Sequence, residues 1–144
     1  MEKGDVLFVQ NYTFRDQGES DKLIILLNDP QKNGSYLYVL TTSKKWFRKD
    51  IPGCHHERGE SYYVIRENDD FLDIRTWVLL DRWEQKDNDE FKSFCDVKKP
   101  HSIGRLKDLT IKQLTNCFKK SDHIPGFVAD LVLYFAMVKL WPGF

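Results

Sequence analysis

The sequence predicts a small α+β domain in which a mostly antiparallel barrel or sheet is followed by helices near the C-terminus. Short runs of β-branched, aromatic and leucine residues recur through the first 83 positions, with turn-forming residues between them. A clear helical pattern appears only after residue 109. The chain of 144 residues, 41% of them hydrophobic, is long enough to bury a core as one domain, 1–144.

Five runs in the N-terminal part of the chain have the composition of strands. They are 5–10, 22–27, 36–42, 61–67 and 76–83, which together form the predicted barrel core at about 3–83. The continuous apolar run at 22–27 is typical of a strand that is buried on both faces. Asn33-Gly34 is a strong hairpin signal, so the strands on either side of it are expected to pair antiparallel.

The C-terminal half predicts one polar excursion and two helices. The polar segment 84–100 is expected to be irregular. A helix is predicted at 110–120, with Thr110 and Gln113 as a capping box and Leu109 and Leu114 as a hydrophobic staple. Its apolar face would carry Ile111, Leu114 and Phe118.

The segment after Pro125-Gly126 is apolar nearly all round and predicts a helix at about 126–141. A buried terminal helix or an oligomer contact is the simplest interpretation. A surface for a partner helix and a membrane tail are the alternatives. Asp130 and Lys139 interrupt a run already short for a membrane span, so no membrane association is expected.

Charge and cysteine content restrict the function classes. Lys plus Arg equals Asp plus Glu at 22 each, so contact with a polyanion would have to come from a local patch. The N-terminus lacks the order of a signal peptide, which favours a cytoplasmic protein. Cys54, Cys95 and Cys117 are odd in number and far apart, so we expect reduced thiols and no disulfide framework.

Several short motifs occur in a fixed order over about residues 3–120. They are Gly4-Asp5 with Val6–Val9, the polar loop 11–21, Lys22 before Leu23–Leu27, Thr42-Ser43 after Tyr36–Leu40, Val78–Asp81 and Ile103–Leu106. In this order they resemble the MazF/PemK family of toxins, which are endoribonucleases of toxin–antitoxin systems. The resemblance implies a small SH3-like barrel with helices. The apolar segment after residue 125 lies outside it.

The resemblance also implies a metal-independent endoribonuclease that cleaves single-stranded RNA without a cofactor. It further implies a homodimer and a cognate antitoxin that occupies the RNA groove. It assigns Lys22 to stabilising charge on phosphate, Thr42 to hydrogen bonding of phosphate or the 2′-oxygen, and Asp81 to proton transfer. The family usually has Arg-Pro where this chain has Lys22-Leu23, and some members have an arginine where this chain has Leu79.

These residue types fit the chemistry of metal-free RNA cleavage. A base must take the proton of the 2′-hydroxyl, an acid must protonate the leaving 5′-oxygen, and cations or N–H donors must stabilise the phosphate. Structural alternatives exist for each residue. Lys22 could be a charged residue at a strand start, Thr42 could satisfy a turn, and Asp81 could pair with Arg82 or cap a turn.

The segment 43–50 is a second candidate for contact with RNA. It places Lys44, Lys45, Arg48 and Lys49 around Trp46 and Phe47. Cations for phosphates beside flat rings for bases are what binding of single-stranded nucleic acid requires. The alternative is a solvated loop with one aromatic ring in the core.

The segment 53–60 contains Cys54, His55 and His56. Neighbouring residues do not easily close one tetrahedral metal site, and no second ligand pair has a suitable spacing, so no metal is expected. His55 or His56 could act as an acid or base near neutral pH, and an exposed loop is the alternative. Cys54 has no visible partners for a nucleophilic role.

A second function class remains open from the sequence. The same fold could be a non-catalytic module that binds RNA or protein, with binding that depends on Trp46 or on the C-terminal helix. A toxin of related fold that binds a topoisomerase is a third and weaker interpretation.

Overall fold

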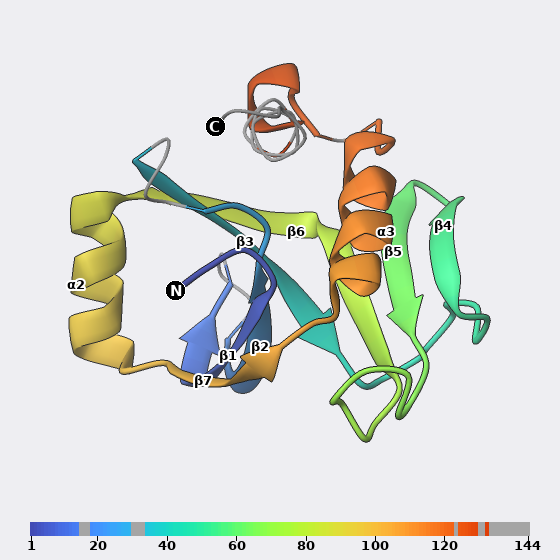
Figure 1. Cartoon of the computed structure of the whole chain (residues 1–144), viewed down its shortest axis with the longest axis horizontal. Helices are drawn as coiled ribbons and strands as arrows, with labels where there is room; N and C mark the ends of the chain where they lie inside the picture. Colours follow the sequence, from blue (N-terminus) through green and yellow to red (C-terminus); the bar gives the residue numbers. More distant parts are fainter. Residues whose placement is uncertain (15–17, 30–33, 123, 130–131, 133–144) are drawn as a thin grey trace.

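The computed structural model describes residues 1–14, 18–29, 34–122, 124–129 and 132 (Figure 1). The sheet has seven strands in the order β4-β5-β6-β3-β2-β1-β7. The strands are β1 (Asp5–Thr13), β2 (Glu19–Leu26), β3 (Ser35–Thr42), β4 (Gly53–Glu57), β5 (Glu60–Ile65), β6 (Thr76–Asp87) and β7 (His101–Arg105). The helices in the described residues include α2 (Asn88–Lys98) and α3 (Asp108–Lys119).

The predicted α+β class is confirmed, and every strand pair in the described residues is antiparallel. The sheet does not close into a barrel, because β4 and β7 form its two edges in the described part of the chain. The five predicted strands are present, and β4 and β7 are additional. Both additional strands are short and mainly polar, so they lack the apolar pattern that marks the others.

The predicted pairing of 22–27 with 36–42 is confirmed. Ile24 lies opposite Leu40, and Ile25 lies opposite Val39. The predicted turn between these strands lies partly outside the described residues. Because side chains alternate along β3, Val39 packs in a first hydrophobic cluster on one face of the sheet, and Leu40 packs in a second hydrophobic cluster on the other face. The two central strands are therefore buried on both faces.

The first cluster, which contains Val39, lies between the sheet and α3. This helix crosses β4 and β5 (Figure 1). Leu114 and Phe118 of α3 are fully buried in this cluster, as predicted for that helical face. Residues 126–129 and 132 are helical, and Val128 and Val132 join the same cluster. This fits the predicted buried terminal helix, although most of 126–141 lies outside the described residues. Within the described residues, no helix is both long enough and apolar enough for a membrane span.

The prediction of an irregular excursion at 84–100 is wrong. The strand β6 continues to Asp87, whose side chain accepts a hydrogen bond from Glu90 N at 2.7 Å. The Glu90 side chain accepts one from Asp87 N at 3.0 Å, which completes a capping box for α2. Phe91 then packs into the second cluster and stacks on Tyr36 with ring centroids 3.7 Å apart. The first three residues of this helix, before Phe91, are all polar, so no apolar helical pattern marks its start in the sequence.

The helix predicted at about 110–120 is present as α3, but its predicted capping box and staple are wrong. The helix α3 begins at Asp108, and its N-cap, Lys107, makes no side-chain capping bond. Gln113 accepts a hydrogen bond from the Tyr63 hydroxyl at 2.6 Å instead of capping the helix. Leu109 is 65% exposed and forms no staple. Packing of the helix on β5 therefore outweighed the local capping pattern.

The prediction that the cysteines stay unpaired is wrong for two of them. Cys54 of β4 and Cys117 of α3 form a disulfide although 63 residues separate them in sequence. Their Cα atoms are 5.6 Å apart because α3 packs against β4. Cys95 of α2 is free. A pairing set by tertiary packing has no signature in cysteine spacing.

Candidate nucleic-acid interface

A groove of about 610 Å³ opens where β1, β2 and β3 meet the segment before β6. Its charged and hydroxyl-bearing lining includes Asp21, Lys22, Thr42, Lys44, Asp73 and Arg82. Apolar side chains, among them Leu23, Leu40 and Leu79, form the rest of its wall. The groove therefore combines a partly apolar wall with a concentration of ionic groups.

Lys22 and Thr42 lie together in this groove, as expected from the predicted strand pairing. The β2–β3 register aligns Ile24 with Leu40, and one residue further along each strand the Thr41 hydroxyl donates to the Leu23 carbonyl oxygen at 2.8 Å. The next residues along these strands, Lys22 and Thr42, both line the groove. The Thr42 hydroxyl accepts a hydrogen bond from Lys44 N at 3.1 Å. A hydroxyl that accepts through oxygen still has its proton to donate, so this turn contact is compatible with binding an anion.

The electrostatic environment of Lys22 is unfavourable for its own charge. Partial burial lowers the pKa of Lys22, and the neighbouring positive charges of Arg82 and Lys44 lower it further. Three cations that converge in a half-buried groove repel one another. An anion bound among them would relieve this repulsion.

Arg82 reaches the groove because the pairing of β6 with β3 is irregular. Leu40 lies opposite Leu79, but the preceding residue, Val39, lies opposite Trp83. The three residues between Leu79 and Trp83 are therefore inserted into β6, and such bulges redirect side chains. Arg82 was not among the site residues predicted from the sequence. No local signal marks it, because the bulge depends on the register with another strand.

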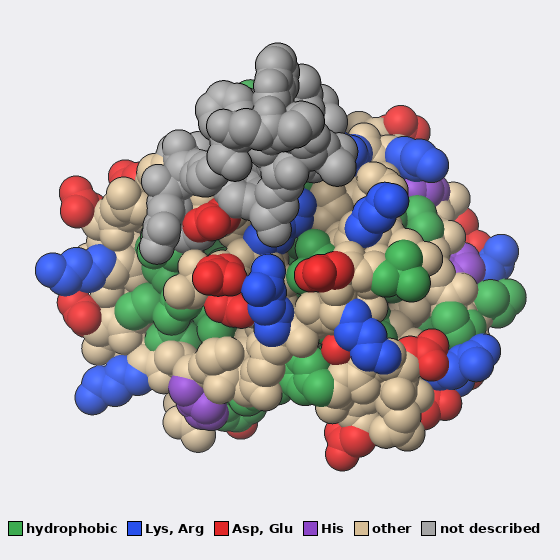
Figure 2. Space-filling view, in the orientation of Figure 1, with side chains coloured by type: hydrophobic (Ala, Val, Ile, Leu, Met, Phe, Trp, Pro, Cys, Tyr) green, Lys and Arg blue, Asp and Glu red, His purple; other side chains and the backbone are tan. Residues whose placement is uncertain are grey.

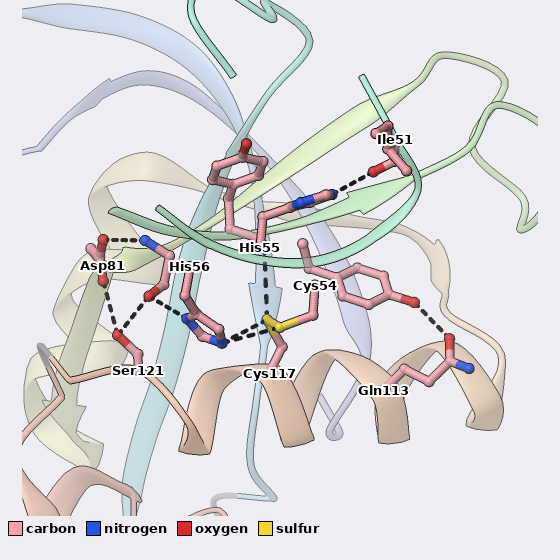
Figure 3. Close-up of a disulfide and its surroundings, with 11 residues drawn as sticks. Ile51, Cys54, His55, His56, Asp81, Gln113, Cys117 and Ser121 are labelled. Carbon is pink, nitrogen blue, oxygen red and sulfur yellow. Dashed lines mark hydrogen bonds between the residues drawn. A yellow bond between two sulfur atoms is a disulfide. The ribbon is translucent and has the colours of Figure 1, made fainter. Parts of the chain in front are cut away.

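Asp81 is adjacent to Arg82 in sequence but does not line the groove. Its Oδ2 accepts a hydrogen bond from Ser61 N at 2.7 Å, and its Oδ1 accepts one from the Ser121 hydroxyl at 3.2 Å (Figure 3). The carboxylate thus joins the start of β5 to Ser121, the second residue after α3. Of the three residues to which the resemblance gives catalytic roles, the structure brings two together and holds the third elsewhere.

In the predicted basic loop 43–50, Arg48 is a buried cation with a structural role. The Arg48 side chain is only 3% exposed and forms an ion pair with Glu60 at 2.7 Å. Its guanidinium carbon lies 5.6 Å from the Trp46 ring centroid and 5.2 Å from the Phe47 ring centroid. Arg48 therefore stabilises the loop through its contacts with Glu60, Trp46 and Phe47. The Trp46 side chain is 66% exposed and lines the groove.

The lysines of the loop differ in position. Lys44 lines the groove, whereas Lys45 is exposed and does not line it. Lys49 forms an ion pair with Glu57 at 3.3 Å, away from the groove. Of the cations predicted to bind RNA, Lys44 and Arg48 line the groove, and Arg48 is already paired with Glu60, so Lys44 is left, among the described residues, as the unpaired cation that acts on Lys22.

His55 and His56 both lie on the edge strand β4, and neither lines the groove. His55 Nε2 lies 2.6 Å from the Ile51 carbonyl oxygen, and its ring stacks on Tyr62 with centroids 5.0 Å apart. His56 contacts Ser61 and the disulfide (Figure 3). An acid–base role for either histidine at the groove is therefore unsupported.

The face of the protein shown in Figure 2 carries mixed charge. On the face in Figure 2, Lys and Arg side chains are interspersed with Asp and Glu side chains. A scan of protein-family models and a search of curated proteins find no match to this chain. The local cluster in the groove is consequently the main guide to function.

Proposed function

We propose that this protein is a metal-independent endoribonuclease of the MazF/PemK type that cleaves single-stranded RNA. The observation that supports it best is the convergence of Lys22, Lys44 and Arg82 with the Thr42 hydroxyl in one groove. A phosphodiester would neutralise the charge of these cations and accept a hydrogen bond from the Thr42 hydroxyl. Arg82 also offers the planar, bidentate group that Lys22 lacks where the family usually has arginine.

In this proposal the 2′-oxygen attacks the adjacent phosphorus and the P–O5′ bond breaks. The products carry a 2′,3′-cyclic phosphate and a 5′-hydroxyl. Lys22 and Arg82 stabilise the charge that builds on the phosphate, and Thr42 donates to one of its oxygens. Among the described residues, Asp21 and Asp73 are the carboxylates that line the groove, so one of them is the candidate for taking the 2′ proton. The leaving 5′-oxygen takes its proton from solvent water in the open groove. Asp81 takes part in no step of this reaction, because both of its carboxylate oxygens accept hydrogen bonds away from the groove.

Trp46 gives the RNA base a surface on which to stack. Its ring is exposed beside the groove, and base–aromatic stacking contributes about 1–3 kcal/mol per base. Trp46 also has a left-handed backbone with φ of 50°, which is uncommon for a bulky residue. Such strain is often retained where a side chain must be presented to a ligand.

The remaining elements of the proposal come from the resemblance. They are the SH3-like fold, a homodimer and a cognate antitoxin that competes with RNA for the groove. A cytoplasmic location is also part of the proposal, and it is an expectation from the sequence itself. Competition of an antitoxin for the groove would require acidic side chains to meet Lys22, Lys44 and Arg82.

The direct test is incubation of the protein with a long single-stranded RNA in EDTA, beside Lys22→Ala, Thr42→Ala and Arg82→Ala. Removing one donor to a developing charge commonly costs about 100- to 1,000-fold in rate, so each variant should cut at least roughly 100-fold more slowly. Lys45→Ala is the matched control, because Lys45 belongs to the same loop without lining the groove. Cleavage by all variants at the wild-type rate would refute the assignment.

The position of Asp81 favours a second candidate function, which is RNA binding without cleavage. Some family members use that aspartate for proton transfer, and here both of its oxygens accept structural hydrogen bonds. A gel shift that depends on Trp46 and Lys22, with intact RNA after long incubation, would favour this second function.

A further inference from the structure

We infer that Cys54, His56 and Cys117 form a zinc-binding site when the disulfide is reduced. This site is separate from the groove and does not depend on RNA cleavage. The two sulfur atoms and a ring nitrogen of His56 all lie within 4.8 Å of one another. Two thiolates and an imidazole are a ligand set that zinc prefers.

The three ligands come from two elements that the fold holds together. Cys54 and His56 are two residues apart on β4, and in the structure both side chains approach α3 at Cys117 (Figure 3). His56 Nε2 lies 3.2 Å from Cys54 Sγ and 3.8 Å from Cys117 Sγ. In a tetrahedral zinc site with bonds of about 2.0–2.3 Å, ligand atoms are separated by roughly 3.3–3.8 Å. The nitrogen is therefore already near its required distance from both sulfur atoms.

A hydrogen-bond chain fixes which nitrogen of His56 faces the sulfur atoms. The Ser121 hydroxyl donates to Asp81, and the Ser61 hydroxyl donates to Ser121 at 2.9 Å. Ser61 Oγ is then left as the acceptor for His56 Nδ1, which lies 2.8 Å away. With its proton on Nδ1, the neutral ring directs the Nε2 lone pair at the sulfur atoms.

This arrangement is the one that metal-binding histidines use. Such a histidine almost always donates its second N–H to an oxygen that fixes the ring and raises its basicity. Here the acceptor is Ser61, supported through Ser121 by the Asp81 carboxylate (Figure 3). In the oxidised state the Nε2 lone pair of His56 faces the two sulfur atoms of the disulfide. Neither sulfur carries a proton, so neither can donate a hydrogen bond to this lone pair. Zinc would use that lone pair.

A dithiol is the reductant that converts the disulfide into the two free thiols. The dithiol transfers two electrons and two protons to the disulfide, which becomes two thiols while the dithiol becomes its own disulfide. Zinc then displaces both thiol protons and binds both thiolates and His56 Nε2. Cys54 and His56 are exposed, so the ion can enter from solvent and keep a water as its fourth ligand.

The test uses the full chain, reduced under argon with a phosphine and then titrated with Co²⁺ and Zn²⁺. We expect one Co²⁺ per chain with the thiolate-to-metal absorption of a tetrahedral site, and displacement of that ion by Zn²⁺. His56→Ala and Cys54→Ser should weaken binding by more than about 100-fold, since loss of an outer contact alone costs roughly 10- to 100-fold. Ser61→Ala removes only such an outer contact, so it should weaken metal binding by roughly 10- to 100-fold.

Two matched controls keep the result specific. His55→Ala removes the neighbouring histidine of the same strand, and Cys95→Ser removes the free cysteine of α2. Both should bind zinc as the wild type does, and circular dichroism should verify that every variant is folded. The inference is overturned if the reduced protein binds no metal, if folded His56→Ala binds as tightly as wild type, or if the oxidised protein binds equally well.

Discussion

Reduction of the Cys54–Cys117 disulfide should lower the free energy of unfolding by about 4 kcal/mol in metal-free buffer. The bond joins residues 63 apart in sequence, and the loop-closure model gives roughly 3 kcal/mol for 15 residues and 4.7 kcal/mol for 100. It also attaches the edge strand β4 to α3, which is otherwise held to β4 by packing. The reduced chain should therefore be folded but less stable.

The assay is equilibrium unfolding in urea, followed by tryptophan fluorescence, with and without a phosphine reductant and a chelator. The doubly substituted variant Cys54→Ser/Cys117→Ser should match the reduced wild type and should not respond to the reductant. Cys95→Ser should respond as wild type does, because Cys95 is outside the bond. A change below about 1 kcal/mol on reduction would refute this reasoning. Adding zinc at about 100 times its dissociation constant should restore roughly 2.7 kcal/mol to the reduced wild type.

Three further predictions concern α2 and the groove. Asp87→Ala removes the N-cap of α2 and should cost about 1 kcal/mol in the urea midpoint analysis. Phe91→Ala empties a site that is only 3% exposed and stacked on Tyr36, so it should cost about 3–5 kcal/mol in the same assay. Because the pKa of Lys22 is lowered, its charge is complete below that pKa and is lost as pH rises through it, earlier than for an ordinary lysine. RNA affinity should therefore fall with rising pH, and Arg82→Gln should move that fall to higher pH in fluorescence anisotropy titrations, since it removes one repelling charge.

The sequence was sufficient for the central strands because their signals are local. β2 is a continuous apolar run, and β3 follows a turn signal, so their antiparallel pairing and the proximity of Lys22 to Thr42 could be predicted. The helix α2 also had a local signal, Asp87 with Glu90, but its polar start obscured it.

Other parts of the candidate site depend on contacts that no local pattern encodes. Arg82 enters the groove through a register shift between β3 and β6. Arg48 resembles a free cation in sequence, yet it pairs with Glu60 from another strand. Cys117 approaches Cys54 only because α3 packs on β4. Tertiary packing decided each of these positions.

The most direct test of the proposed function is the chemical identity of the RNA ends that the protein produces in EDTA. Mass spectrometry of fragments from a defined single-stranded RNA should find 2′,3′-cyclic phosphate on one side of each cut and 5′-hydroxyl on the other. Fragments with 3′-hydroxyl ends, or RNA that stays intact while wild-type protein is folded and in excess, would contradict the account.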